Sequence, residues 1–111
     1  MKDKYESVGL NYEIIANKYP NLDEYEEIVN SFLSDPFFKE IGEYLDGEDY
    51  ALAKDACKGL YLLAQELCLF NLYMWIVEVY EDLEEELYQE AYSHYQEMMS
   101  VYDGIRGAFN V

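Results

Sequence analysis

Cationic side chains are scarce in this chain. Its 111 residues include seven Lys and Arg against 24 Asp and Glu, which gives a formal net charge of −17 at pH 7. Nucleic acids and anionic membranes attract proteins mainly through clustered Lys and Arg side chains, which this composition does not supply. We therefore expect a protein that binds neither nucleic acid nor a membrane surface.

Cysteine and histidine are scarce as well, which argues against a metal centre. Cys57 and Cys68 lie on one expected helix, where about 16 Å would separate them, beyond the reach of a disulfide. Without a nearby His they make a poor zinc site, so we expect two small buried side chains. The single histidine, His94, has Glu90 four residues before it. A di-iron centre in a helical bundle needs Glu-x-x-His on two helices, so we expect no metal and a solvated or hydrogen-bonded His94.

Signatures of enzymes, membrane spans and export are also missing. The sequence contains no phosphate-binding loop, dinucleotide-binding fingerprint or nucleophile elbow, so we expect neither an enzyme nor a bound cofactor. The longest apolar run, residues 67–77, is interrupted by Asn71 and is too short to cross a bilayer. The N-terminus lacks the basic and then apolar segments of a signal peptide, and we expect a cytoplasmic protein.

Helix ends are marked clearly in the first half of the chain. Asn11 and Asn21 are typical helix caps, Asp35 before Pro36 is typical of a helix start, and Gly47 is typical of a helix end. A further helix is expected over residues 49–67. Because residues 60–103 contain no Gly or Pro, two more breaks are inferred, near residues 68–71 and near the acidic residues 82–86. The last helix is expected to stop at residues 103–104.

Apolar residues recur at helical spacing in each of these segments, which predicts one buried stripe per helix. The expected stripes are Tyr25, Ile28, Val29 and Phe32; Phe37, Ile41 and Leu45; Ala53, Ala56 or Cys57, Leu60, Ala64 and Leu67; and Tyr88, Ala91, Tyr92, Tyr95, Met98, Met99, Tyr102 and Ile105. Several amphipathic helices with short connections predict an all-α antiparallel bundle. We expect one domain over residues 1–111, monomeric, with residues 1–8 as a loosely ordered lead-in.

An ordered set of features in residues 47–72 resembles the phosphoacceptor helix of histidine-containing phosphotransfer (Hpt) domains, the four-helix modules of two-component phosphorelays. Asp49 and Tyr50 match its acidic and aromatic start, and residues 67–69 match its Leu-small-Leu break. Residues 9–13, 21–25 and 32–38 are similar to upstream parts of the family, so the resemblance covers residues 9–72. It implies a four-helix bundle of Hpt type with short additional N-terminal helices.

The resemblance places Lys58 where the family has its phosphoacceptor histidine. The family's supporting lysine and glycine, three and four residues later, are Tyr61 and Leu62 in this alignment. A second alignment, with a three-residue gap, makes Lys58 and Gly59 the family's Lys-Gly pair and puts Asp55 in the place of the histidine; we favour the first. A lysine ammonium has no lone pair with which to attack phosphorus, so we expect no phosphotransfer.

The residues around Lys58 predict a docking surface. Lys54, Lys58, Tyr61, Leu62 and Gln65 share one helix face by their spacing. The resemblance implies a receiver domain or a histidine kinase as partner, and a lysine would hydrogen-bond the acidic site of a receiver. Two alternatives remain open. The stretch of residues 60–104, which has ten acids and no Lys or Arg, also suits a decoy of nucleic-acid charge, and the tyrosine-rich surface suits a scaffold for an unrelated protein.

Overall fold

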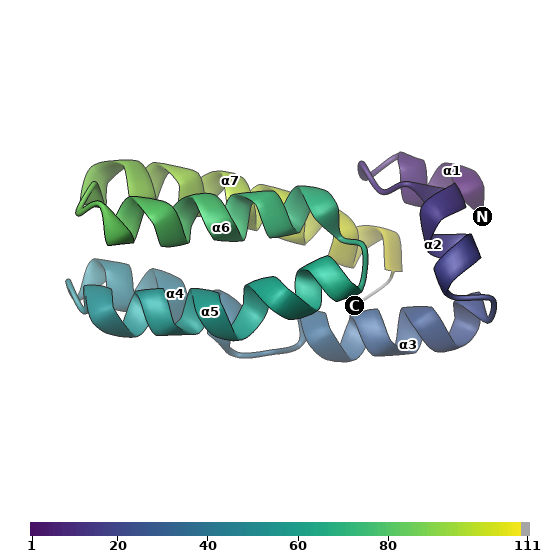
Figure 1. The fold of residues 1–111 in the computed structure, drawn as a ribbon, viewed down its shortest axis with the longest axis horizontal. Helices are drawn as coiled ribbons and strands as arrows, with labels where there is room; N and C mark the ends of the chain where they lie inside the picture. The colour runs from purple at the N-terminus through teal and green to yellow at the C-terminus, as the bar shows by residue number, and fades with distance from the viewer. Residues whose placement is uncertain (110–111) are drawn as a thin grey trace.

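The computed structural model describes residues 1–109, in which every regular element is a helix and no strand is present (Figure 1). The expectation of an all-α protein is therefore confirmed for this range. The described residues form α1 (Lys2–Glu6), α2 (Tyr12–Lys18), α3 (Leu22–Leu33), α4 (Phe37–Asp46), α5 (Tyr50–Glu66), α6 (Phe70–Glu84) and α7 (Tyr88–Phe109). None of these helices has the length and apolar character that crossing a membrane requires.

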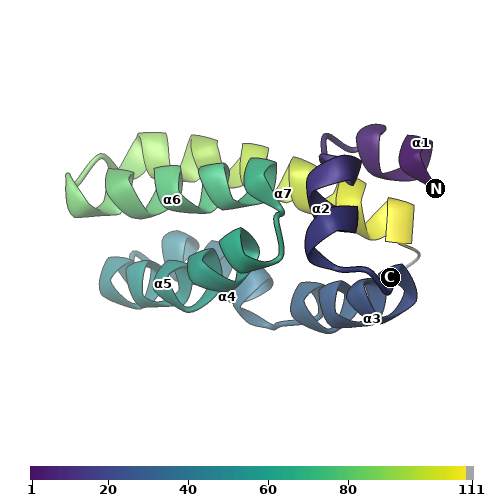
Figure 2. The same cartoon turned by 45° about the vertical axis from the view of Figure 1, so that its right-hand side comes forward.

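Helices α4 to α7 lie side by side and alternate in direction along the chain (Figures 1 and 2). The main packing contacts join α4 to α5, α5 to α6, and α6 to α7. The long α7 continues past these neighbours to α3, while α1 and α2 cover the end of the molecule beside α3 (Figure 2). The result is an elongated molecule of 41 × 20 × 19 Å.

The expected helix starts are present, and side chains satisfy backbone donors at three of them. The Asn11 and Asn21 side chains each accept a hydrogen bond from the backbone N–H three residues later, at 3.1 Å. Asp35 accepts one from the N–H of Phe37 at 2.8 Å, directly before α4. Each bond satisfies a backbone donor that has no partner within the helix itself, which is why these residue types begin helices.

Both of the breaks inferred without Gly or Pro are confirmed. One residue in the turn after each of three helices adopts the left-handed conformation. These residues are Glu48 after α4 (φ 58°), Cys68 after α5 (φ 60°) and Glu86 after α6 (φ 59°). In each turn the next N–H donates to the carbonyl five residues earlier, at 2.8 to 2.9 Å. This bond is the usual closure of a helix that ends in a left-handed residue. Such a conformation is costly without glycine, so the packing of the helices must compensate for it.

The predicted end of the last helix is wrong. Helix α7 continues through Gly104 to Phe109. Ile105 is fully buried and Phe109 is 3% exposed, so both extend the buried stripe of Met98 and Tyr102 by two turns. Burying these two side chains outweighs the cost of the two helical glycines, Gly104 and Gly107, which is about 1 kcal/mol each.

Two predicted stripe positions are also wrong, because Ile28 is 41% exposed and Tyr92 is 44% exposed. Leu33 of α3, which was not among the predicted positions, is fully buried. In α4 the fully packed aromatic residue is Phe38, and Phe37 is half-buried. Helical spacing leaves adjacent positions at the edge of a stripe unresolved, and the neighbouring helices decide between them.

Residues 1–8 differ from the expected loose lead-in, because Lys2–Glu6 form α1. The Tyr5 side chain is fully buried and its hydroxyl donates to Glu26 at 2.8 Å. Lys4 forms an ion pair with the same carboxylate at 2.6 Å. The Tyr5 ring also packs 5.2 Å from that of Phe109, so α1 is held against both α3 and α7.

Candidate functional site

The five residues predicted to share one face of the Lys58 helix do lie together on the outer side of α5. We call this surface the Lys58 face; it consists of Lys54, Lys58, Tyr61, Leu62 and Gln65. Lys58, Leu62 and Gln65 are exposed, while Lys54 and Tyr61 are half-buried. Leu62 leaves 66% of its surface in solvent, the largest exposed fraction among the large apolar side chains of the described residues.

Aromatic residues of α6 support the Lys58 face from one side. The Tyr61 ring lies edge-on between the rings of Tyr73 and Tyr80, at centroid distances of 6.4 and 5.7 Å. The Lys58 Nζ lies 5.7 Å from the centroid of the Tyr80 ring. A cation at this distance over an aromatic face is attracted by the ring. Lys58 is therefore oriented by Tyr80 while its ammonium group stays at the surface.

The two lysines of this face differ in their ionic partners. Lys54 pairs with Glu84 at 3.8 Å, and Tyr80 donates a hydrogen bond to the same carboxylate. The bond from Tyr80 and the nearby Lys54 lower the pKa of Glu84, and the bond raises the pKa of Tyr80 to about 12. Within residues 1–109 no carboxylate lies within 4.0 Å of the Lys58 ammonium. Lys58 is thus the lysine whose charge remains available to a partner.

Asp55, the alternative match for the phosphoacceptor, is also exposed on α5. In that alignment Gly59 would be the family's glycine, which leaves room for a receiver domain to approach. In this structure a Cβ at Gly59 would lie 2.9 Å from the ring of Phe37 in α4. The space on this side of Gly59 is therefore occupied by Phe37 of the same chain.

Both cysteines are buried, as predicted. Cys57 precedes Lys58 but points to the opposite, inner side of α5, where it is fully buried. Burial raises the pKa of Cys57 to about 12 and also raises the pKa of Cys68. A thiol with such a pKa stays protonated at neutral pH and is a poor nucleophile. Cys57 is therefore a buried thiol without nucleophilic character at neutral pH.

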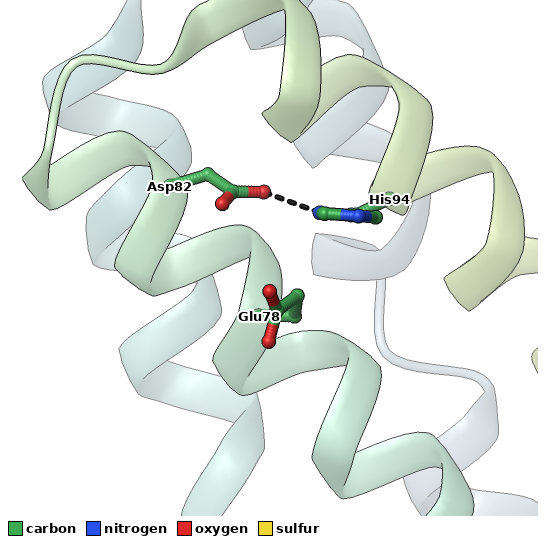
Figure 3. Close-up of side chains that lie close together, drawn as sticks. All are labelled: Glu78, Asp82 and His94. Atoms are coloured by element: carbon green, nitrogen blue, oxygen red, sulfur yellow. Dashed lines mark hydrogen bonds and ion pairs between the residues drawn. The ribbon is translucent and has the colours of Figure 1, made fainter.

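The single histidine lies on the other flank of α6, in a cluster that the sequence did not predict. Figure 3 shows His94 of α7 facing Asp82 and Glu78 of α6. The His94 Nδ1 is 2.6 Å from the Asp82 Oδ2, and one donor atom from each of the three side chains lies within 4.8 Å of the others. Asp82 is 6% exposed and is the one charged residue buried among residues 1–109. The Trp75 ring packs against the imidazole at a centroid distance of 5.6 Å.

The spacing along α7 had pointed to Glu90 as the neighbour of His94, and this is corrected by the structure. The hydrogen-bonding partner is Asp82, from the preceding helix. Glu78 and Asp82 are four residues apart, so they share one face of α6, and this signal was present in the sequence. Which residue of α7 meets that face depends on the turn after α6, whose geometry the sequence does not reveal.

Two groups of polar side chains therefore flank α6. The Lys58 face lies on the side of α5, and the cluster of Glu78, Asp82 and His94 lies on the side of α7. No protein-family model matches the chain, and no curated protein or solved structure matches it significantly.

Proposed function

We propose that the chain is an Hpt-like four-helix module that docks to the receiver domain of a response regulator and does not itself carry a phosphoryl group. The order of the helices supports this proposal, since α4 to α7 alternate in direction and short helices precede them. The observation that carries it is Lys58, which occupies the histidine position of the resemblance. Its ammonium group is exposed and lies over Tyr80 without a carboxylate partner among the described residues.

Phosphotransfer is not part of the proposal, because the described residues offer no suitable nucleophile on the Lys58 face. The protonated ammonium of Lys58 has no lone pair to attack phosphorus. Cys57 is buried and protonated on the inner side of α5. His94 is on the other flank of α6, and its Nδ1 is engaged by Asp82.

The Lys58 face suits an acidic docking partner of receiver type. The lysine would form charge-assisted hydrogen bonds to the acidic side chains around the receiver's aspartate, and these bonds are stronger than neutral ones. Tyr61 and the exposed Leu62 would supply apolar contact beside the charged group. Because the chain as a whole carries a charge of −17, long-range forces oppose an acidic partner, and short-range contacts must provide the affinity.

The test is binding of the purified chain to receiver domains by biolayer interferometry, at about 0.05 M and about 0.3 M NaCl. Lys58→Glu should weaken binding by more than about tenfold, because it places a carboxylate against the acidic partner. The matched control is Lys39→Glu, which makes the same charge change at an exposed position of α4 and should leave the affinity unchanged. Circular dichroism would verify that both variants fold.

The same chain would be tested in parallel against histidine kinases and basic proteins, and for transfer of labelled phosphate from receivers. The following outcomes would contradict the proposal in distinguishable ways. Equal affinity of the wild type and Lys58→Glu removes Lys58 from the interface. Transfer of labelled phosphate from a receiver to the chain shows that the module is active in phosphotransfer. Binding to a histidine kinase alone assigns the other partner of a phosphorelay. Binding to basic proteins alone, with affinity that falls steeply with salt, supports a decoy of nucleic-acid charge instead.

A further inference from the structure

We propose that Glu78, Asp82 and His94 form a binding site for one divalent transition-metal ion. Two carboxylates separated by one turn of α6 converge with an imidazole from α7 (Figure 3). The site lies on the flank of α6 that faces away from the Lys58 face. It is therefore independent of the proposed docking function.

The donor set identifies the chemical class of the ion. Carboxylates alone suit Mg²⁺ or Ca²⁺, whereas an imidazole nitrogen favours Mn²⁺, Fe²⁺, Co²⁺, Ni²⁺ or Zn²⁺. One histidine with two carboxylates supplies three protein ligands and leaves further positions for water. The cluster would thus hold a transition-metal ion that remains accessible to solvent.

The geometry requires only small side-chain movements. At metal–ligand distances of about 2.1 Å, neighbouring donor atoms are separated by about 3.0 to 3.4 Å. In this structure the Nδ1 of His94 and the Oδ2 of Asp82 are 2.6 Å apart, and all three donors lie within 4.8 Å of one another. An ion between them would replace the hydrogen bond that joins His94 and Asp82. His94 and Asp82 would separate slightly, and Glu78 would rotate towards them.

The charge around Asp82 also favours a cation. A buried carboxylate is costly unless it is paired. In the described residues, His94 is the one side chain that forms a hydrogen bond with the Asp82 carboxylate. Glu78 adds a second negative charge nearby, and neither acid forms an ion pair with Lys or Arg in residues 1–109. Two carboxylates without cationic partners create a negative potential that a divalent ion would neutralise.

Trp75 provides the readout for the test. It is the only tryptophan of the chain, and its ring lies 5.6 Å from that of His94. Co²⁺ bound at the cluster should therefore quench the tryptophan fluorescence. We would titrate the chain with Co²⁺ in the presence of excess Mg²⁺, which occupies the many exposed carboxylates. The expected result is saturable quenching at one ion per chain, with an enthalpy titration giving the same stoichiometry.

Two variants and a matched control locate the ion. His94→Gln and Asp82→Asn each remove a ligand and should weaken Co²⁺ binding by at least about tenfold. Glu90→Gln removes an exposed carboxylate four residues before His94 and should leave the affinity within about twofold. Lys58→Glu should likewise leave Co²⁺ binding intact, and His94→Gln should leave receiver binding intact.

Several outcomes would overturn the site. Quenching that does not saturate, that excess Mg²⁺ abolishes, or that persists unchanged in His94→Gln would assign the ion to the general acidic surface. If His94→Gln does not fold, proton NMR of the Co²⁺-loaded wild type decides the question. Strongly shifted imidazole resonances from the single histidine support the site, and unshifted ones contradict it.

Discussion

The two flanks of α6 hold their charges in opposite ways. On the flank of α5, the ion pair of Lys54 and Glu84 is 3.8 Å long and its side chains are 33% and 47% exposed. On the flank of α7, Asp82 and His94 lie 2.6 Å apart and the Asp82 side chain is 8% exposed. Water screens both groups of the first pair, whereas in the second pair it reaches His94, which is 30% exposed, and is largely excluded from the Asp82 carboxylate. An exposed flank can offer its charge to another molecule, whereas a buried one must compensate its charge internally or with a bound ion.

The largest effect on stability is expected for the buried pair. In a double-mutant cycle, Asp82→Ala and His94→Ala should show a coupling of about 1.5 to 3 kcal/mol in the free energy of unfolding. Either single change leaves one partner without its hydrogen bond, so the double variant should be more stable than additivity predicts. Urea unfolding followed by circular dichroism measures all four proteins.

A control cycle makes this result specific to the pair. Glu90→Ala combined with His94→Ala tests the neighbour that spacing along α7 suggested, and its coupling should stay below about 0.5 kcal/mol. If the two cycles give equal couplings, Asp82 is not the preferred partner of His94. The contrast between the two flanks would then be lost.

The next effect concerns Tyr80 on the exposed flank. Its hydrogen bond to Glu84 raises its pKa to about 12, from an ordinary value of 10.0. Removal of the acceptor carboxylate in Glu84→Ala should lower the pKa of Tyr80 towards 10, because the phenol loses both the bond and the adjacent negative charge. The pH dependence of the Tyr80 ring-carbon resonance in NMR measures this, with Tyr80→Phe assigning the signal.

Glu81→Ala serves as the matched variant for this measurement. Glu81 is an exposed acid on the same helix and forms no hydrogen bond with Tyr80. The pKa of Tyr80 should therefore stay near 12 in this variant. A wild-type Tyr80 that titrates near 10 would show that the bond to Glu84 does not persist in solution.

Much of the fold was predictable because its signals are local. Asn11 and Asn21 cap helices through their own side chains, and an uninterrupted apolar stripe identifies the inner side of α5. The end of α7 was not predictable in this way. Gly104 is a local signal to stop, but Ile105 and Phe109 find buried positions against other helices, and this packing prevails. Tyr5 is a similar case, since its burial depends on α3 and α7 together.

The same distinction separates the two candidate sites. The Lys58 face comes from one helix, so spacing alone brought its five residues together. The cluster of Glu78, Asp82 and His94 combines two helices, and its register depends on a turn in which Glu86, not glycine, adopts the left-handed conformation. Sequence spacing could place the two acids on one face, but it could not place His94 opposite them.

The smallest effect is expected for the exposed pair of Lys54 and Glu84. A double-mutant cycle of Lys54→Ala and Glu84→Ala should give a coupling well below that of Asp82 and His94, since exposed pairs gain little and lose side-chain freedom. About 1 M NaCl should abolish it, because the Debye length then falls to about 3 Å. The Asp82–His94 coupling should persist in the same salt. If salt lowers the Asp82–His94 coupling as much as the Lys54–Glu84 coupling, solvent reaches both flanks of α6 equally. The buried character assigned to Asp82 would then be wrong.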